Sequence, residues 1–505
     1  MNPRWAPWLA FAVTVLCALG LAVLHGPPLP RIHDEFSYAL GGDTFASFRL
    51  ANPQFPLWRS FETFHVLSQP TYSSKYPPAQ FALLAFGQLV FGRQYVGTWI
   101  GLGLASAAVT WFVASWNRPR ETWLAAITCG VLLGNSYWAY SYFSAAPAAI
   151  GGALVGGALL RWPDSRRASL ALVAGLGAVL LVFSRPFEGF LVSAAFGVLV
   201  ARRIFAPANR EALVKKLVVP LGLVLVAGLA LLLYYDHAVT GRALKLPYIL
   251  YEETHGPMPI FVWGHPRAEP AVQLQPFVDF AAYNSKWYDW ATSPSSAPLA
   301  ALFRLSNYAE VFLVLPLALA LPISLYDRDL DRRKDSRRLA AIAAACLFAM
   351  LASVFSFAHY AAPLTAIFVT LVVRGLVTLW DRSERIAKAM PFVLAFSLAA
   401  VAYQGHTWAA EKSKDWHQSR AKIERHLRAQ SGDHLVFVTY GTPHHFLREW
   451  VYNGADLEHD RVLWARSLDP ESDLKLMEHY PDRRLWRIVV TDDGHDLQPL
   501  VRTNR

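Results

Sequence analysis

The stretch WLAFAVTVLCALGLAVL, residues 8–24, decides the class of fold. It carries no charge and approaches the ~20 apolar residues that a helix needs to cross a bilayer. Because no small-residue cleavage pattern follows it, we interpret it as a retained first span and not as a signal peptide. Similar runs follow at residues 95–116, 122–140, 144–160, 169–183, 187–201, 217–235, 306–325, 339–357, 361–379 and 389–403. The sequence therefore predicts a polytopic α-helical membrane protein with about eleven transmembrane helices.

The composition of the whole chain agrees with this class. Of 505 residues, 54% are apolar and 17% are charged, whereas soluble domains carry about 25% charged residues. A soluble multidomain enzyme, a disordered chain and a disulfide-rich secreted module are thereby excluded. The cysteines, Cys17, Cys129 and Cys346, lie inside apolar runs, so neither a disulfide framework nor a cysteine zinc site is predicted.

The placement of basic residues sets the predicted orientation, because short cytoplasmic loops are enriched in Lys and Arg. Residues 78–91 are apolar but short, and we interpret them as an interfacial or re-entrant helix. If that segment does not cross, basic loops such as residues 201–216 and 328–338 share one side, and the short loops opposite hold only Arg185. We therefore expect a cytoplasmic-membrane protein with its amino terminus in the cytoplasm and its carboxyl terminus outside. The net charge of +10 is explained by this orientation and by anionic lipid headgroups, and no nucleic-acid partner is predicted.

This orientation gathers the polar segments on the extracytoplasmic face. Residues 1–405 are predicted to form the transmembrane domain, with outer loops at residues 25–79 and 237–303. Residues 406–505 differ in composition, because HLVFVTY, RVLWARSL and RLWRIVVTD are short β-rich runs with helix and loop material between them. We predict a small extracytoplasmic α/β domain there.

The outer segment RIHDEFSYALGGDTFASFRLANP, residues 31–53, gives the strongest local signal. Asp34 and Glu35 stand side by side just after the first span. Desolvation at the membrane surface is expected to raise a carboxylate pKa toward the range of a general base. The alternative is an amphipathic interfacial helix whose start is capped by Asp34.

Two further outer segments supply cations. Lys75 and Tyr76 in SSKYPPAQ suit contact with a phosphate headgroup, and the alternative is ordinary snorkelling at the interface. Arg185 and Glu188 in SRPFEG lie in a short outer turn between two spans. They are interpreted either as functional charges or as an ion pair with each other.

The fourth segment is AHYAAP, with His359 and Tyr360 in an outer turn where aromatic-belt residues are also common. Because the four segments share one face, they offer a carboxylate base together with cations and hydroxyls. That combination suits transfer of a group from a lipid-linked phosphate to a hydroxyl. The predicted catalytic residues are Asp34 and Glu35, and the predicted donor-phosphate contacts are Lys75, Tyr76, Arg185, His359 and Tyr360, with Glu188 beside them.

The acidic pair after the first span, followed by KYPP at residues 75–78, resembles the GT-C superfamily of integral membrane glycosyltransferases. Protein O-mannosyltransferases, aminoarabinose transferases and Rgt-type lipid A glycosyltransferases are members. The resemblance covers residues 1–240, and the later spans only by architecture. It implies a polyprenyl-phosphate sugar as donor, inversion at the transferred sugar, Asp34 as base, Glu35 as an orienting group and Lys75 as a phosphate contact.

The chain departs from that family at one position. Aminoarabinose transferases have a second acid at the outer end of the third and fourth spans, and the corresponding stretch SYFSAAPAAIGG, residues 141–152, has none. The acceptor, whether lipid, glycan or protein, therefore stays unassigned. No cofactor or metal ligand set is predicted, and no pattern supports a divalent cation. The alternatives are a transporter or flippase of lipid-linked saccharides and a non-catalytic membrane scaffold.

Overall fold

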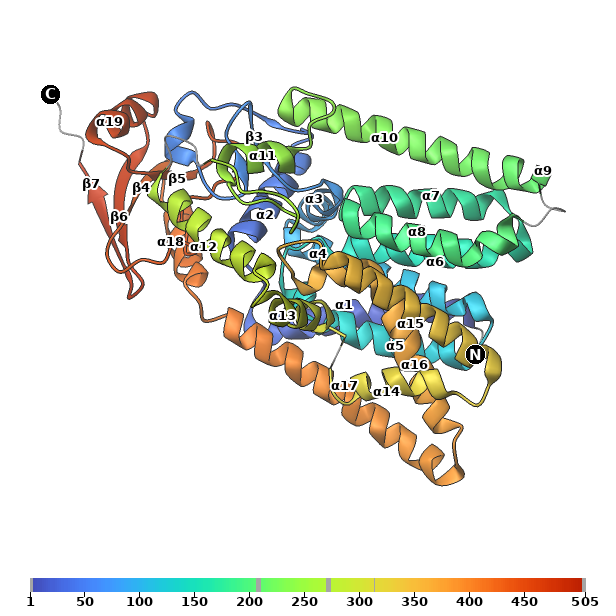
Figure 1. Cartoon of the computed structure of the whole chain (residues 1–505). Coiled ribbons are helices and arrows are strands. Elements are labelled where there is room, and N and C mark those ends of the chain that lie inside the picture. The colour runs from blue at the N-terminus through green and yellow to red at the C-terminus, as the bar shows by residue number, and fades with distance from the viewer. Residues whose placement is uncertain (1–2, 206–209, 269–273, 313, 502–505) are drawn as a thin grey trace.

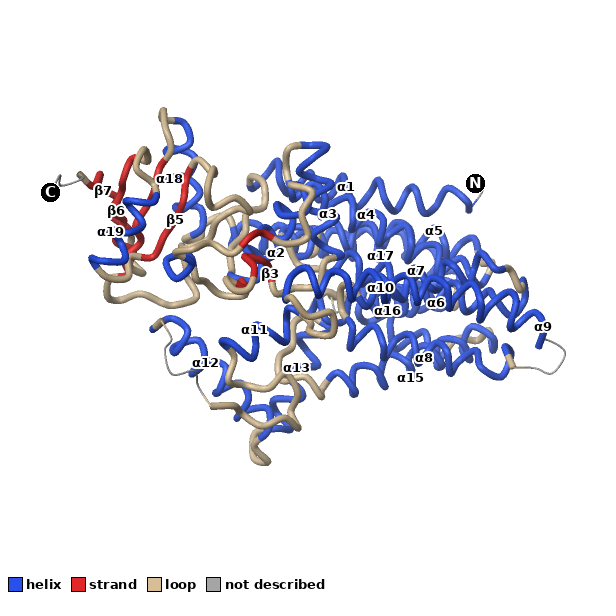
Figure 2. Tube along the Cα trace, turned by 90° about the horizontal axis from the view of Figure 1, so that it is seen from above, coloured by secondary structure: helices blue, strands red, loops and turns tan. Residues whose placement is uncertain are grey.

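The computed structural model describes residues 3–205, 210–268, 274–312 and 314–501. Long helices form a bundle, and the outer loops and the sheet gather at one end of it (Figure 1). The amino terminus lies at the opposite end of the bundle (Figure 2). Residues 269–273 of the predicted second loop and residue 313 of the predicted span 306–325 lie outside the described residues.

The bundle helices are apolar over most of their length. They are α1 (Ala6–His25), α4 (Gln94–Val113), α5 (Pro119–Gly134), α6 (Ala145–Ser165), α7 (Ala168–Val182), α8 (Pro186–Ile204), α10 (Val219–Thr240), α14 (Leu317–Ile323), α15 (Leu330–Met350), α16 (Thr365–Trp380) and α17 (Glu384–Lys412), with the short α9 (Arg210–Leu213) before α10. Local chemistry sets their ends. For example, α1 stops where Gly26 adopts φ 83° and two prolines follow.

Six helical segments of the described chain are long and apolar enough to cross a membrane. They are Pro3–His25, Gln94–Trp116, Ala145–Ser165, Val214–Thr240, Ala358–Trp380 and Glu384–Lys412. These apolar helices indicate a multi-pass membrane protein. The other predicted spans correspond to helices that are shorter or carry more charge.

The predicted span 306–325 is not one continuous helix. Helix α13 (Ala297–Ala309) ends early in it, and α14 begins again after Pro316. Proline lacks the N–H that a helix interior requires, but it is well suited to the start of a helix. The predicted span 122–140 also ends early, at Gly134, and continues as the turn Tyr137–Tyr140.

Burial differs sharply among the spanning helices. In an apolar 18-residue window of each segment, 94% of the window is buried in Ala358–Trp380, but only 22% in Pro3–His25 and 11% in Val214–Thr240. The first is thus the centre of the bundle, and the other two present apolar surface outward. A Cβ at Gly152 of α6 would lie 2.0 Å from the carbonyl oxygen of Pro363. Glycine therefore lets α6 approach the turn that carries His359 and Tyr360.

The elements of the two predicted outer loops are short helices and strands at the end of the bundle away from the amino terminus (Figure 1). The first loop contains α2 (His33–Ala46), β1 (Asn52–Pro53), β2 (Val66–Leu67) and β3 (Thr71–Ser74), and leads into α3 (Ala79–Phe91). The second loop contains α11 (Pro247–His255) and α12 (Gln275–Thr292). Strands β1 and β2 both pair antiparallel with β3.

The carboxyl-terminal part confirms the predicted mixed composition of helix and strand. After α18 (His417–Ala429), a four-stranded sheet has the order β5-β4-β6-β7. Its strands are β4 (His434–Tyr440), β5 (Val462–Arg466), β6 (Arg484–Val490) and β7 (His495–Leu500), with α19 (Pro470–His479) between β5 and β6. The three predicted β-rich runs form β4, β5 and β6, which pair in parallel. Strand β7 was not predicted, because its sequence HDLQPL is polar and largely exposed at the edge of the sheet.

This sheet unit docks directly on the first outer loop. The Asp43 carboxylate accepts a 2.7 Å hydrogen bond from the backbone N–H of Ala455. The Phe36 ring stacks on Tyr452 with ring centroids 4.3 Å apart. Because both Asp43 and Phe36 belong to α2, the helix that carries Asp34 is held between the bundle and the sheet.

Candidate active site

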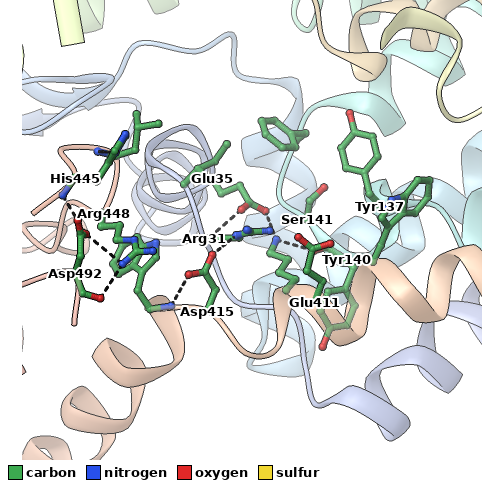
Figure 3. A pocket seen from close by; sticks show the side chains of 16 residues that line it. Arg31, Glu35, Tyr137, Tyr140, Ser141, Glu411, Asp415, His445, Arg448 and Asp492 are labelled. Atoms are coloured by element: carbon green, nitrogen blue, oxygen red, sulfur yellow. Dashed lines mark hydrogen bonds and ion pairs between the residues drawn. The ribbon is translucent and has the colours of Figure 1, made fainter. Parts of the chain in front are cut away.

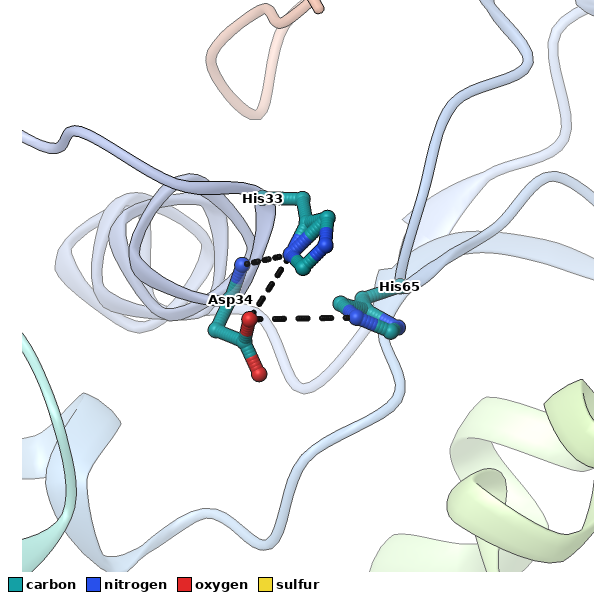
Figure 4. Close-up of side chains that lie close together, drawn as sticks. All are labelled: His33, Asp34 and His65. Carbon is teal, nitrogen blue, oxygen red and sulfur yellow. Dashed lines mark hydrogen bonds and ion pairs between the residues drawn. The ribbon is translucent and has the colours of Figure 1, made fainter. Parts of the chain in front are cut away.

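Asp34 is the second residue of α2, and its carboxylate faces a small group of polar side chains (Figure 4). Its Oδ1 accepts a short hydrogen bond from the Tyr76 hydroxyl, and its Oδ2 lies 2.7 Å from Nδ1 of His33. Nε2 of His65 is 3.9 Å from the same Oδ2. The helix has no side-chain cap, so Asp34 does not perform the capping role of the alternative interpretation.

The loop that carries His65 is held in an unusual backbone conformation. His65 has φ 62°, in the left-handed region that non-glycine residues rarely adopt. Its carbonyl oxygen accepts hydrogen bonds from the Ser37 hydroxyl at 2.6 Å and from the backbone N–H of Lys75 at 3.1 Å. Contacts from α2 and from the KYPP element therefore hold this strained residue with its ring beside Asp34.

The pKa of Asp34 lies well below its ordinary value. Burial by itself would raise it, but His65 and His33 nearby and the hydrogen bonds from His33 and Tyr76 lower it. Burial and the charge of Lys75 hold the pKa of His65 well below its own ordinary value. The direction of the Asp34 shift is opposite to the raised carboxylate pKa expected from desolvation. Asp34 is an ionised carboxylate at neutral pH.

Tyr76 and Lys75, which are predicted to contact the donor phosphate, both have partners within the protein. Besides its bond to Asp34, the Tyr76 ring stacks on Tyr38 with centroids 4.4 Å apart. The Lys75 ammonium lies 2.8 Å from Oε1 of Glu252, and it also faces the ring of Tyr248 at 4.5 Å. Lys75 is buried and already paired, so its charge is largely neutralised inside the protein.

Arg185, His359 and Tyr360 come together around the turn that precedes α16. The guanidinium of Arg185 lies over the Tyr360 ring, 4.0 Å from its centroid. His359 stacks on Phe143 with centroids 4.3 Å apart. The charges of Arg185 and Glu188 attract each other, but among the described residues the two side chains form no ion pair within 4.0 Å. The buried Nε of Arg185 has no hydrogen-bond partner, so this donor stays free.

These residues belong to the same neighbourhood as Asp34. Burial raises the pKa of Tyr38, Asp34 raises it further, and the charge of Arg185 lowers it. The Tyr38 hydroxyl lies 3.0 Å from that of Ser144, in the stretch that lacks the second acid. The four predicted outer segments thus converge on one aromatic cluster. It is formed by Tyr38, Tyr76, Phe143, His359 and Tyr360.

Glu35 points away from this group although it is adjacent to Asp34 in sequence. Its Oε1 lies 2.6 Å from the ammonium of Lys412, at the end of α17, and accepts a 3.1 Å hydrogen bond from the backbone N–H of Tyr142. Successive residues of a helix point in different directions, which explains the separation. Glu35 forms a buried ion pair and does not contact the partners of Asp34.

His33, Asp34 and His65 are also the group best suited to a metal ion in the described chain. One ligand atom from each lies within 4.8 Å of the others. Two imidazoles and a carboxylate match the ligands that Zn²⁺ accepts. In the structure, Tyr76 donates to Oδ1 of Asp34 and Oδ2 lies 2.7 Å from Nδ1 of His33, which also accepts the backbone N–H of Asp34 at 3.1 Å. A cation that used Nδ1 of His33 would have to displace these contacts, so the arrangement of this atom is that of a hydrogen-bonded group and not of a metal ligand.

Several residues of the site were not identified from the sequence. His33 stands directly beside Asp34, and His65 and Glu252 lie far from it in the chain. A histidine next to an acid could have been noticed as a signal. His65, Glu252 and Lys412 reach their partners only through packing between loops and helix ends, which no local pattern reveals.

Comparisons with known proteins show similarity of fold. No protein-family model and no curated protein matches the chain. ArnT from Cupriavidus metallidurans in the apo state matches with a TM-score of 0.53 and 12% identity, over 95% of this chain and 93% of that one. ArnT from the same organism bound to undecaprenyl phosphate matches with a TM-score of 0.51 and 14% identity, over 100% of this chain and 99% of that one.

A second kind of enzyme matches as well. The Archaeoglobus fulgidus oligosaccharyltransferase in complex with Zn and sulfate has a TM-score of 0.50 and 14% identity, over 95% of this chain and 67% of that one. This chain covers 62% of the length of the same oligosaccharyltransferase in its apo form. Over its described residues the chain is therefore similar in structure to the GT-C membrane glycosyltransferases, which confirms at the level of fold the resemblance that the Asp34–Glu35 pair and KYPP predicted.

Proposed function

We propose that this protein is a membrane glycosyltransferase that moves a sugar from a polyprenyl-phosphate-linked donor to a hydroxyl of an extracytoplasmic acceptor. One observation carries the proposal: an ionised, hydrogen-bonded carboxylate, Asp34, stands at the loop-bearing end of a GT-C-like bundle. The ArnT structure that matches this chain end to end is bound to undecaprenyl phosphate, which supports a lipid phosphate as the carrier.

The proposed reaction is a single displacement at the anomeric carbon of the donor sugar. The acceptor oxygen attacks that carbon, and Asp34 takes the hydroxyl proton as general base. The bond between the anomeric carbon and the phosphate oxygen breaks, and the electron pair stays on the departing polyprenyl phosphate. Tyr76 and His33 hold the carboxylate in place through its two oxygens.

The departing phosphate needs cations and donors nearby. Of the predicted contacts, Arg185 is the strongest, because its buried Nε has no partner in the described chain. Tyr360 lies against the guanidinium, and His359 packs beside Tyr360 with ring centroids 5.0 Å apart. Lys75 is already paired with Glu252, so its assigned role is to shape the electrostatics of the site more than to bind phosphate directly.

We further propose the eleven-span topology, with residues 1–405 in the membrane and residues 406–505 outside. The positive-inside rule supports it. Basic residues such as Arg118, Arg120 and Arg332 join acidic partners where α5 begins and α15 begins. Helix α2, which carries Asp34, lies instead at the opposite end of the bundle, in the first outer loop (Figure 1). This topology leaves the amino terminus in the cytoplasm and the site in the extracytoplasmic leaflet of the cytoplasmic membrane.

Reconstituted transfer is the direct test. Purified protein in liposomes is supplied with radiolabelled sugars on undecaprenyl phosphate, both hexoses and pentoses, and with an envelope fraction from cells that lack this protein. We expect label from one of these donors to leave the lipid phase and join an acceptor. Empty liposomes with the same donors are the control.

The outcome also separates the proposal from its main alternative. If labelled donor crosses the bilayer in the presence of the protein and no transfer product forms from any of the sugars, the protein is a flippase and the proposal fails. If neither movement nor transfer occurs while the same liposomes bind undecaprenyl phosphate, a non-catalytic role is favoured.

Removal of metal gives a separate prediction. Because Tyr76 donates to Oδ1 of Asp34 and Nδ1 of His33 is held against Oδ2 and the backbone N–H of Asp34, dialysis against EDTA is expected to leave the transfer rate unchanged. The measurement compares the initial rates of dialysed protein with and without added Zn²⁺ or Mn²⁺. A loss of about tenfold or more that either ion restores would show that His33, Asp34 and His65 bind a catalytic cation.

A further inference from the structure

A cavity of about 560 Å³ lies on the side of α2 that Glu35 faces, between the bundle and the sheet unit (Figure 3). Its walls come from the start of α2, the turn Tyr137–Tyr140, the end of α17 and the loops of the sheet. Such a volume is typical of a small-molecule site. Asp34 does not line this cavity, so it is distinct from the carboxylate cluster described above.

The arginines and the lysine that line the cavity are each paired with an acid. Arg31 lies 2.6 Å from Asp415, and Arg448 lies 3.2 Å from Asp492. The third cation, Lys412, forms the ion pair with Glu35. Paired charges leave no surplus of positive charge for a phosphate or a carboxylate ligand. They still present alternating hydrogen-bond donors and acceptors to a polyhydroxylated ligand.

Other wall residues provide flat apolar faces and a free acceptor. Trp408, Trp416 and Tyr140 line the cavity with aromatic rings, which suit the C–H faces of sugar rings. The exposed carboxylate of Glu411 also lines it and has no ion-pair partner among the described residues. A carboxylate of this kind accepts hydrogen bonds from two neighbouring hydroxyls.

The cavity reaches the residues around the proposed reaction centre. Tyr137 and Phe143 both line it. The Tyr137 hydroxyl lies 3.1 Å from Nδ1 of His359, and the Phe143 ring stacks on the same histidine. A ligand in the cavity therefore contacts the same aromatic cluster that adjoins Asp34 and Arg185.

We propose that this cavity binds the acceptor and that the acceptor is an uncharged oligosaccharide. This inference rests on the proposed function and narrows its acceptor class. The aromatic walls orient the sugar rings, and Glu411 and the exposed edges of the ion pairs hold the hydroxyls. The reacting end of the acceptor chain then extends past Tyr137 and Phe143 toward Asp34.

Saturation-transfer NMR on the full chain in nanodiscs tests this without any donor. The probes are the neutral trisaccharides maltotriose, cellotriose and mannotriose, with glucose 6-phosphate and a serine-containing tripeptide as the anionic and peptide alternatives. We expect transfer to at least one neutral trisaccharide and not to the other two probes. The signal is expected to fall by about fivefold in Trp408→Ala and to fall in Glu411→Gln, which changes an exposed side chain and so preserves the fold.

Matched variants away from the cavity serve as controls. Trp263→Ala removes a tryptophan that is 65% exposed in the second outer loop, and Glu384→Gln changes an exposed acid at the other end of α17. Both are expected to keep the full signal. No transfer to any trisaccharide, equal signals in Trp408→Ala and Trp263→Ala, or preferred binding of glucose 6-phosphate or the tripeptide would each overturn the proposal.

The failure of this inference and that of the proposed function are distinguishable. Asp34→Asn is expected to keep saccharide binding, because Asp34 does not line the cavity. If the cavity binds saccharide but no donor supports transfer, the proposed function fails and the binding site stands. If transfer occurs but Trp408→Ala and Glu411→Gln bind and transfer as the wild type does, only the acceptor assignment fails.

Discussion

Asp34→Asn is expected to lower the transfer rate by about 10²–10⁴-fold, the usual contribution of a general base. The amide has nearly the same shape as the carboxylate, so Tyr76 can still donate to its oxygen. It cannot take the proton of the acceptor hydroxyl. The wild-type carboxylate is ionised at neutral pH because its pKa is well below the ordinary value, so the base is available without a change of protonation.

The measurement is the rate of transfer in liposomes, with binding of undecaprenyl phosphate and thermal unfolding followed on the same preparations. Only the rate should change. Asp279→Asn is a matched control, because Asp279 is an exposed acid of α12 that accepts a 2.9 Å hydrogen bond from Gln275, one turn earlier in the same helix. A rate in Asp34→Asn equal to that of Asp279→Asn would remove Asp34 as the base and leave the proposed reaction without one.

Lys412→Met is expected to destabilise the folded protein by about 3–5 kcal/mol, the cost of leaving one partner of a buried pair alone. Lys412 bonds both Glu35, at 2.6 Å, and the carbonyl oxygen of Tyr140, at 2.7 Å. The side chains of Glu35 and Lys412 are 2% and 11% exposed, so the pair is buried apart from the edge that lines the cavity between the bundle and the sheet. The pair joins α2 to the end of α17, and its loss should loosen the loop that carries Asp34.

Thermal unfolding in detergent measures this effect. The double variant Glu35→Gln/Lys412→Met removes both charges and is expected to recover part of the stability, as replacement of whole buried pairs does. Lys475→Met is the matched control, because Lys475 forms an exposed ion pair with Glu471 at 2.6 Å, and solvent screens such pairs. If Lys412→Met and Lys475→Met unfold at the same temperature, the buried pair has no structural role.

Glu35 and Asp34 show what the local sequence predicts about the candidate site and what it does not. Their adjacency and their place after the first span indicate a GT-C-like loop, and the fold comparison agrees. The same adjacency does not say which acid faces the reaction centre. Helix geometry separates them, and partners distant in sequence, Tyr76 for Asp34 and Lys412 for Glu35, fix each direction.

The direction of the pKa shift of Asp34 is a second property that the sequence does not predict. Burial does act to raise the pKa, as the sequence position suggests. The outcome is reversed by the nearby His65 and His33 and by the hydrogen bonds of His33 and Tyr76 with the carboxylate. His33 is a neighbour in sequence, whereas His65 and Tyr76 belong to later parts of the loop. The balance between burial and hydrogen bonding depends on distances of a few ångströms, which no sequence pattern contains.

The sequence by itself determined the membrane class, the resemblance to GT-C enzymes and the strands β4, β5 and β6. Each follows from features that are local in the chain: apolar length, a short motif after the first span, or β-rich composition. Only the tertiary structure decided that span 306–325 is interrupted, that Lys75 is paired with Glu252, and that a cavity opens between the bundle and the sheet. These depend on contacts between residues far apart in sequence, since packing and ion pairing are set by proximity in space.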